Sequence, residues 1–269
     1  MTHLPAPPDP DALDPFFARL SQALCALLLL DYDGTLAPFR LDRTRATPWP
    51  GVREALAAIQ ATGRTRLVLV SGRPVGEVAD LLGLDPAPEI WGVHGLERRT
   101  PDGRVRREPL PPRAEVGLEQ AAAWAASMGL GPRTERKHGA LAIHLRGMSD
   151  ADALRFSRAA RAALAPIADR HGLAVLSFVA GVELRVPSAR KARAVTTLLS
   201  EMPDDTVVAC LGDDATDEDA FEALHGRGET FLVRVSPRPS HARWLLPPPE
   251  GVLAFLARWA ASRPSRKAP

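Results

Sequence analysis

The sequence predicts an α/β fold in which a parallel sheet covered by helices is interrupted by an inserted α+β block. Short apolar runs alternate with amphipathic stretches of helical length, as expected of parallel βαβ units. Between the first and the last of these units lies a segment with a hairpin signal and an alternating strand. Both signals are typical of antiparallel structure, so the block is expected to form a domain of its own.

The expected core strands are runs of leucine, valine and other apolar residues that each end at a polar residue or a glycine. Such a run is typical of a strand buried on both faces of a parallel sheet, although its periodicity also allows a helix. The runs lie at 23–30, 66–71, 206–212 and 230–235. An amphipathic stretch at 52–63 closes on a glycine and is expected to be an intervening helix.

The central block begins with the hairpin signal R-R-T-P-D-G-R-V-R-R and continues through an alanine-rich helix, the alternating segment A-L-A-I-H-L-R and a second helix. The helices are expected at 113–129 and 150–170, and a further strand pair at 173–178 and 182–186. The βαβ pattern resumes near Lys191. The predicted domain ranges are therefore a core over 14–104 and 186–261, an insertion over 105–185, and flexible proline-rich tails at 1–13 and 262–269.

Composition limits the classes of function. The chain has 269 residues, of which 45% are hydrophobic and 25% charged, as in ordinary globular proteins. No apolar run reaches the ~20 residues that span a bilayer, and no signal peptide is recognised. The two cysteines lie in apolar runs without metal-type spacing, so we expect a cytoplasmic protein. The formal net charge of +2 and the interspersed charges argue against nucleic acid as the partner, and we expect a monomer.

The first candidate site is D-Y-D-G-T-L, directly after the leucine run. Alternate residues of a strand point to the same side, so Asp31 and Asp33 can face one point at the strand's carboxyl end, where open parallel sheets bind ligands. Gly34 permits a tight turn with N–H groups available to an anion. Adjacent carboxylates repel unless a cation separates them, and Mg2+ prefers such oxygens, so a metal is indicated. An ordinary surface D-G turn is the alternative.

The second acidic cluster, G-D-D-A-T-D-E-D, again follows an apolar run and a glycine. Thr216 and Asp219 have the spacing of a capping box, and acidic residues are favoured in the first turn of a helix by its dipole. A helix that starts here would therefore explain the later acids of the cluster. Asp213 and Asp214 precede that predicted cap. We expect them to be ligands of the same ion.

Two further residues stand at element ends. Ser71 in V-S-G-R ends a strand and could hold a phosphate oxygen, although S-G is commonly only a turn. Lys191 opens a predicted helix, where a positive charge is unfavourable against the helix dipole, and the chain has only three lysines. Its position indicates negative charge nearby.

In this order, D-Y-D-G-T-L, S-G-R, a later lysine and G-D-D-A-T-D resemble the four motifs of the haloacid dehalogenase superfamily of phosphotransferases. The flanks W-G-V-H-G-L-E, E-R-K-H-G-A-L-A-I-H-L-R, G-V-E-L-R and P-P-E-G-V-L-A-F-L are similar to the trehalose-6-phosphate phosphatase family. The resemblance covers roughly residues 24–257 and implies a Rossmann-like core with an inserted α+β cap domain. It also implies Mg2+-dependent hydrolysis of trehalose 6-phosphate through an aspartyl-phosphate.

The resemblance assigns a role to each site residue. Asp31 would be the nucleophile, Asp33 the general acid and then base, Ser71 a phosphate ligand and Lys191 the charge-balancing cation. The implied metal ligands are Asp31, the main-chain carbonyl of Asp33, Asp213 and Asp214, with Asp217 in or next to the ligand set. The implied substrate-binding residues are Gly34, Thr35 and Arg73 in the core, and Glu135, Lys137, Arg146 and Glu183 in the cap.

Alternatives remain open at the sequence level. The substrate could be another glycoside phosphate, such as sucrose phosphate, glucosylglycerol phosphate or mannosyl-phosphoglycerate, because the catalytic core would be identical. A non-catalytic sugar-phosphate sensor would keep the pocket without turnover, whereas a P-loop kinase is disfavoured because no G-x-x-x-x-G-K-[ST] occurs. We assign no catalytic role to the lone His94, and predict that Tyr32 packs on the side opposite to the acids.

Overall fold

The computed structural model describes residues 2–40, 42–178 and 181–264. The chain divides into two compact units, of which the first comprises Met1–Val105 and Arg190–Pro269 and the second Arg106–Ala189. The second unit is thus an insertion in the first. The range expected for this insertion from the sequence is 105–185.

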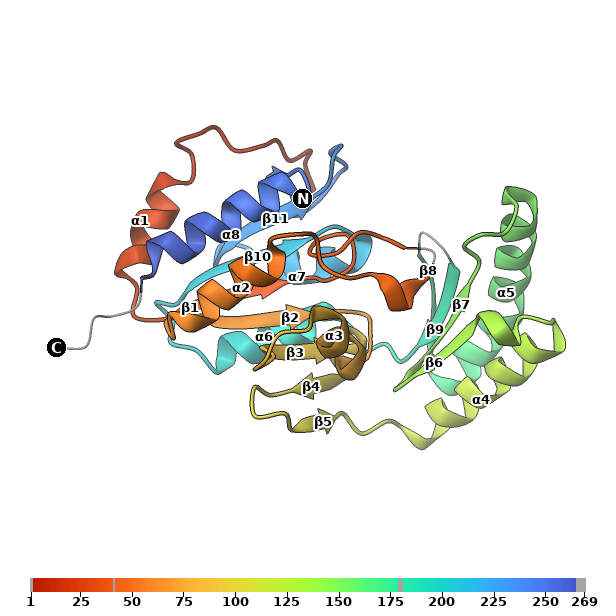
Figure 1. The fold of residues 1–269 in the computed structure, drawn as a ribbon. Coiled ribbons are helices and arrows are strands. Elements are labelled where there is room, and N and C mark those ends of the chain that lie inside the picture. Colours follow the sequence, from red (N-terminus) through yellow and green to blue (C-terminus); the bar gives the residue numbers. More distant parts are fainter. Residues whose placement is uncertain (1, 41, 179–180, 265–269) are drawn as a thin grey trace. The chain divides into compact units, whose positions relative to one another are not determined.

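An eight-stranded sheet forms the centre of the first unit, with the order β12-β11-β10-β1-β2-β3-β4-β5 (Figure 1). The strands are β1 (Ala26–Leu30), β2 (Arg66–Val70), β3 (Glu89–Gly92), β4 (Glu97–Arg99), β5 (Val105–Arg107), β10 (Val207–Gly212), β11 (Glu229–Val233) and β12 (Trp244–Leu246). Pairing is parallel from β12 to β3 and antiparallel between β3 and β4. The chain leaves β1 toward β2 and later returns to β10 on the other side of β1. A topological switch point, where such sheets bind ligands, therefore lies between β1 and β10.

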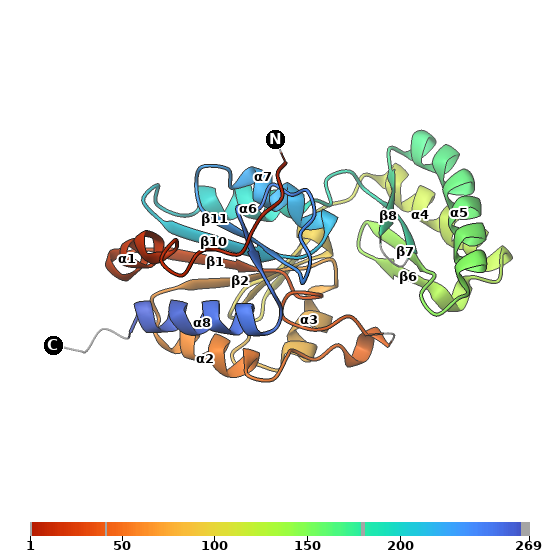
Figure 2. The same ribbon diagram turned by 90° about the horizontal axis from the view of Figure 1, so that it is seen from above.

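Helices cover both faces of this sheet (Figure 2). One face carries α1 (Asp14–Gln22), α2 (Val52–Ala61), α3 (Val75–Leu82) and α8 (Glu250–Ser262), and the other carries α6 (Lys191–Ser200) and α7 (Glu218–Ala223). Leu28 and Leu30 of β1 pack in the first core, whereas Leu27 and Leu29 pack in the second. Because both faces of β1 are buried, the strand is apolar at every position.

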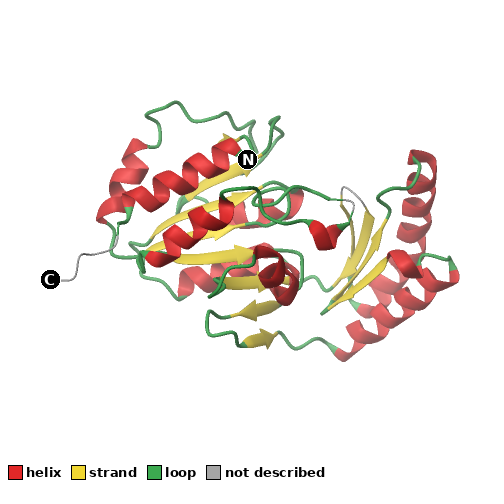
Figure 3. Cartoon of the chain, in the orientation of Figure 1, coloured by secondary structure: helices red, strands yellow, loops and turns green. Residues whose placement is uncertain are grey.

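The second unit has a four-stranded antiparallel sheet with the order β6-β7-β9-β8 (Figure 3). Its strands are β6 (Thr134–Lys137), β7 (Ala140–His144), β8 (Ala174–Phe178) and β9 (Gly181–Arg185). The helices α4 (Pro112–Ser127) and α5 (Asp150–His171) pack together on one side of this sheet. The strand predicted from A-L-A-I-H-L-R is β7. Its alternation is typical of a half-exposed strand, but β7 is buried at every position except the half-buried His144.

The predicted α/β class is confirmed, and the strands and helices expected from the sequence occur within about three residues of their predicted ends. The elements without a counterpart among the predicted ones are α1, α3, α8, β3, β6 and β12. Four short 3₁₀ helices complete the described elements: η1 (Arg43–Arg45), η2 (Val93–Gly95), η3 (Gly131–Arg133) and η4 (Ala215–Asp217). Within the described ranges, none of the helices combines the length and the apolar character needed to cross a membrane.

Parts of the segments expected to be flexible tails make specific contacts. His3 pairs with Ser240 and Ala6 with Trp244 as isolated β-bridges. Arg263, within the range expected to be the second tail, is fully buried and donates hydrogen bonds to the carbonyls of Leu20, Ala23 and Arg64. A guanidinium can donate hydrogen bonds to several main-chain carbonyls at once. The proline content, on which the expectation of a flexible tail was based, does not reveal such contacts. The rest of that tail, 265–269, lies outside the described residues.

Candidate active site

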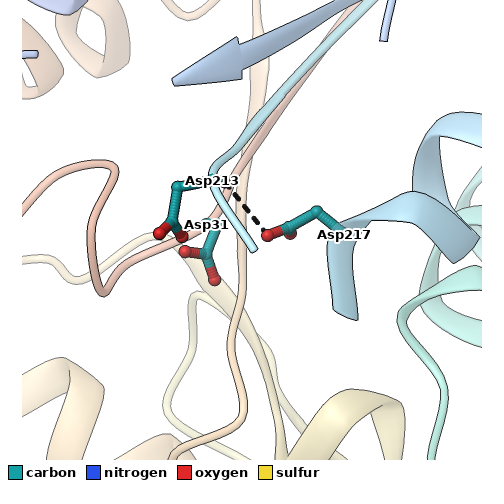
Figure 4. A group of neighbouring side chains, drawn as sticks. All are labelled: Asp31, Asp213 and Asp217. Carbon is teal, nitrogen blue, oxygen red and sulfur yellow. Dashed lines mark hydrogen bonds between the residues drawn. The ribbon is translucent and has the colours of Figure 1, made fainter. Parts of the chain in front are cut away.

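Three acidic side chains meet at the carboxyl edge of the sheet, where β1 and β10 end side by side (Figure 4). Asp31 directly follows β1, and its N–H donates to the carbonyl of Leu211 in β10 at 2.9 Å. Asp213 directly follows β10, and Asp217 reaches the same point from η4. One carboxylate oxygen from each of the three lies within 4.8 Å of the others, and all three residues are buried. The predicted convergence of Asp31 and Asp213 is thereby confirmed.

Lys191 supplies positive charge to this acidic cluster, defined as Asp31, Asp213 and Asp217. Its Nζ donates to Asp31 Oδ1 and, at 2.7 Å, to Asp217 Oδ1, and the residue is only 3% exposed. Burial by itself would lower the pKa of Lys191, but the charges and hydrogen bonds of Asp217 and Asp31 raise it above its usual value. The ammonium therefore stays charged. The prediction that negative charge lies near Lys191 is confirmed.

One ammonium does not neutralise three carboxylates. Burial raises the pKa of Asp31 against the opposing effect of Lys191, and burial together with the charges of Asp31 and Asp217 raises the pKa of Asp213. In addition, Asp213 Oδ1 is buried and has no hydrogen-bond partner among the described residues. An unpaired buried carboxylate oxygen in a site with excess negative charge suits a hard divalent cation that binds oxygen ligands.

The turn after β1 is built to approach Asp213 closely. Gly34 has φ +81°, and a Cβ placed on it would lie 2.2 Å from Asp213 Oδ2, so no other residue fits without displacing the carboxylate. Next in the turn, Thr35 is fully buried, and its hydroxyl has no hydrogen-bond partner among the described residues. The turn thus contains a buried hydroxyl without a described partner, and the substrate-binding roles of Gly34 and Thr35 stay predictions.

The loop after β10 departs from expectation. The capping box is formed by Asp214 and Asp217 rather than by Thr216 and Asp219, so it begins two residues earlier than the sequence predicts. Asp214 has the extended backbone of an N-cap, with φ −110° and ψ 173°, and its side chain accepts from the N–H of Ala215 at 2.7 Å. Asp217 Oδ2 in turn accepts from the N–H groups of Asp213 and Asp214 at 3.1 and 3.0 Å. Asp214 therefore caps its own turn, and its role as a metal ligand stays a prediction.

Ser71 lies at the end of β2, the strand next to β1, and is buried. Its hydroxyl accepts from the N–H of Arg73 at 3.1 Å, which shapes the S-G-R turn. A Cβ on Gly72 would lie 2.7 Å from the ring of His94, so this histidine packs directly on the turn. Val93 and His94 both have left-handed φ values, +46° and +52°. Such strained geometry is typical of functional sites, and the sequence does not predict it here.

Asp33 and Tyr32 follow Asp31 in the turn but face other partners. Both oxygens of Asp33 accept from Arg73, each at 2.6 Å, so Asp33 is not a member of the acidic cluster. Tyr32 is fully buried in the core, and its hydroxyl donates to the carbonyl of Ala46 at 2.8 Å. The predicted packing role of Tyr32 is confirmed.

In the second unit, charged side chains gather on one face of the sheet. Glu135 of β6 lies opposite Ala142 of β7, which in turn lies opposite Glu183 of β9. Lys137 Nζ lies 3.1 Å from Glu183 Oε1 and 3.8 Å from Glu135 Oε2, so the three residues singled out in this sheet are brought together.

Two residues that were not expected to act join this group. His144 Nε2 lies 2.9 Å from Glu135 Oε2, and Arg185 Nη1 lies 3.5 Å from Glu183 Oε2. Arg185 stands two positions from Glu183 on β9, and that period-two spacing is the signal that could have identified it. Arg146 lies just beyond β7, and its carbonyl accepts a hydrogen bond from Arg133 at 2.9 Å.

Comparison with known proteins agrees with this architecture. A model of the trehalose-phosphatase family matches residues 29–247. A trehalose-phosphate phosphatase from Mycobacterium marinum is 32% identical over 87% of this chain, and one from Mycobacterium bovis is 33% identical over 97%. This chain spans only 61% and 67% of their respective lengths. A solved structure of Aspergillus fumigatus trehalose-6-phosphate phosphatase aligns with a TM-score of 0.68 and 26% identity, covering 96% of this chain and 99% of that one.

Proposed function

Because the chain belongs to the trehalose-phosphatase family, we propose that it hydrolyses trehalose 6-phosphate to trehalose and phosphate through an aspartyl-phosphate. The observation that carries this proposal is the buried meeting of Asp31, Asp213 and Lys191 at the switch point of the sheet. A carboxylate that accepts a hydrogen bond from a buried ammonium, beside further carboxylates that suit a cation, has the groups needed to attack phosphorus.

In the first step, Asp31 attacks the phosphorus atom and the bond to the sugar oxygen breaks. The hydrogen bond from Lys191 favours the ionised, reactive form of Asp31. Asp33 protonates the departing sugar oxygen and later takes a proton from the water that cleaves the aspartyl-phosphate. Ser71, Thr35 and the main-chain N–H groups of the turns hold the phosphoryl oxygens. Positioning and charge neutralisation of this kind supply most of the catalysis of phosphoryl transfer.

Mg2+ would be held by Asp31, the main-chain carbonyl of Asp33 and Asp213. When bound, it supplies positive charge to the phosphoryl oxygens. The unpaired Oδ1 of Asp213 and the elevated pKa of its carboxyl support this assignment, because both show that the described residues do not stabilise the ionised form of this carboxyl. Asp217 already binds Lys191 and two main-chain N–H groups, so we propose that it orients the loop and the lysine.

The sugar hydroxyls are proposed to bind Glu135, Lys137 and Glu183. Arg146, which follows β7, is proposed to bind them as well. Alternating acceptors and donors of this kind suit the dense hydroxyls of a disaccharide. The pairing of Lys137 with Glu183 at 3.1 Å supports the idea that these side chains are pre-oriented. A second candidate, a phosphatase for another glycoside phosphate, differs only in this group and leaves the chemistry of the core unchanged.

A phosphate-release assay with Mg2+ across a panel of disaccharide and glycoside phosphates tests the substrate. Trehalose 6-phosphate is expected to give the highest kcat/KM, and a clear preference for another member of the panel would contradict the substrate assignment while leaving the mechanism in place. Asp31→Asn should abolish turnover, with Asp80→Asn, an exposed aspartate on α3, as the matched control. A folded Asp31→Asn protein that still releases phosphate would refute the nucleophile. A wild-type protein that binds sugar phosphates without turnover would be a sensor.

We further propose that the protein acts as a monomer in the cytoplasm. Cys25 and Cys210 are free thiols, which suits a reducing compartment. Light scattering coupled to size-exclusion chromatography should give the mass of a single chain, and the mass of a dimer would contradict the proposal.

A further inference from the structure

We propose that Arg73 is a positioning residue for Asp33, which it holds in the orientation needed for proton transfer to the leaving group. This inference rests on the proposed phosphatase function, and it differs from the expectation that Arg73 binds the substrate. Its basis is the set of partners that surrounds the guanidinium.

Arg73 grips both oxygens of Asp33. Nε donates to Oδ2 and Nη2 to Oδ1, each at 2.6 Å, in the planar fork that arginine forms with a carboxylate. The side chain of Arg73 is 8% exposed, whereas that of Asp33 is 26% exposed. The arginine therefore lies beneath the aspartate, and the aspartate keeps an accessible side.

The arginine is itself held in place. Its Nη1 donates to the Glu77 carboxylate and, at 2.8 Å, to the main-chain carbonyl of Arg43. Glu77, in the first turn of α3, also pairs with the guanidinium of Arg43 at 2.7 Å. All three nitrogens of Arg73 are thus engaged, and the two arginines balance the two carboxylates. Such a neutral network offers little positive charge to a phosphate but fixes the position of Asp33.

The fork is compatible with proton transfer. A carboxylate has about four lone-pair sites, of which the fork uses two, so the others remain for the proton in transit. Asp33 first takes up a proton from solvent at one of these remaining sites. As the phosphorus–oxygen bond breaks, its electron pair stays on the sugar oxygen, which takes this proton. In the second step Asp33 takes a proton from water, whose oxygen bonds to phosphorus while the bond to Asp31 breaks. Both steps need the Asp33 oxygens at a defined place, because small misplacements strongly reduce such rates.

Two substrates with different leaving groups separate this role from phosphate binding. A sugar alkoxide needs the acid, but p-nitrophenolate is a good leaving group without it, and kcat/KM reports only the events up to departure of the leaving group. For Arg73→Lys, we expect kcat/KM for trehalose 6-phosphate to fall about 10²-fold or more, mainly in kcat. For p-nitrophenyl phosphate we expect a fall of less than about fivefold. Equal losses for both substrates, or a rise confined to KM, would overturn the proposal in favour of phosphate binding.

A double-mutant cycle tests the connection directly. If Arg73 acts through Asp33, adding Arg73→Lys to Asp33→Asn should cause no further loss on trehalose 6-phosphate, whereas independent roles would multiply the two losses. Multiplied losses would overturn the proposal.

Glu77→Gln provides a second variant, which removes the carboxylate that pairs with both Arg73 and Arg43. It should show the same substrate-dependent pattern as Arg73→Lys to a smaller extent, and unchanged activity on both substrates would contradict the proposed anchoring. Arg53→Lys is the matched control, because Arg53 donates to the carbonyls of Leu81 and Leu82 at the other end of α3. Thermal unfolding of each variant checks the fold. Wild-type inactivity on every sugar phosphate would instead refute the proposed function and is distinguishable from all these outcomes.

Discussion

Replacing Asp213 by asparagine should stabilise the metal-free protein at neutral pH and abolish its stabilisation by Mg2+. The carboxylate of Asp213 lies within 4.8 Å of those of Asp31 and Asp217. At an effective dielectric constant of about 20, two unit charges at that distance repel by roughly 3 kcal/mol. The amide of asparagine removes this repulsion while nearly preserving the shape of the side chain.

Protonation limits how much the repulsion can cost. An aspartate that has the ordinary pKa of 3.8 when unfolded pays at most ~4 kcal/mol at pH 7 to remain protonated in the folded state. The folded, metal-free protein holds this proton above pH 4 and the unfolded chain does not, so the contribution of Asp213 to stability falls as pH rises. The burial and charges that raise the pKa of Asp213 carry it to about 10, so the decline should continue through neutral pH.

Thermal unfolding of wild type and Asp213→Asn, with EDTA or with saturating Mg2+, measures both effects. In EDTA, the Tm of the variant relative to that of wild type should increase between pH 5 and pH 8. At pH 8 the variant should unfold on the order of 5–10 °C above wild type. Mg2+ at about a hundred times its Kd should stabilise wild type by ~2.7 kcal/mol and leave the variant unchanged. Asp80→Asn is the control and should behave as wild type.

Two results would refute this reasoning. An Asp213→Asn protein that is less stable than wild type in EDTA at pH 8 would mean that the carboxylate is satisfied by groups of the chain itself. An equal Mg2+-induced shift in Tm for the variant and wild type would mean that the ion binds elsewhere.

Three further changes probe other parts of the site. Gly34→Ala should lower the free energy of unfolding by about 1–3 kcal/mol and abolish phosphate release, because the added methyl group would overlap Asp213 Oδ2 at a backbone φ of +81°. Denaturant unfolding and a phosphate assay check the two effects. An active, stable variant would contradict the close approach of Gly34 to Asp213. Lys191→Met should cost about 3–5 kcal/mol and eliminate turnover, because it leaves two buried carboxylates without their cation; urea unfolding measures the loss, and a loss below about 1 kcal/mol would show that Lys191 is not needed for charge balance. Lys137→Met should lower kcat/KM for trehalose 6-phosphate while leaving p-nitrophenyl phosphate hydrolysis unchanged, and equal losses on both substrates would argue against a sugar contact.

Much of the fold could be read from local pattern. The leucine run before Asp31 predicts a strand buried on both faces, and β1 sends alternate leucines into two cores. The helix starting at Lys191 and the long α5 also follow from periodicity and end signals. α3 and α8 were not singled out, although both are short amphipathic helices like α2. Their limits depend on which apolar residues find a partner in the core.

The candidate site was predictable to a smaller extent. Asp31 and Asp213 could be placed at strand ends because a strand end is a local feature. The capping box was misplaced by two residues because Asp217 bonds to main-chain groups of Asp213 and Asp214, a choice made by the tight turn. Nothing near Arg73 indicates that its guanidinium binds Asp33, since the two residues are 40 positions apart.

The sequence by itself determined which chemical groups stand at the ends of strands, because side-chain direction in a strand repeats every two residues and glycine permits the turns. Only the tertiary structure decided which of these groups meet. Strand order places β10 beside β1 and so brings Asp213 to Asp31, and the packing of α6 brings Lys191 to the same point across 160 positions. Such pairings depend on how distant elements bury their apolar faces against one another, and local pattern contains no record of that arrangement.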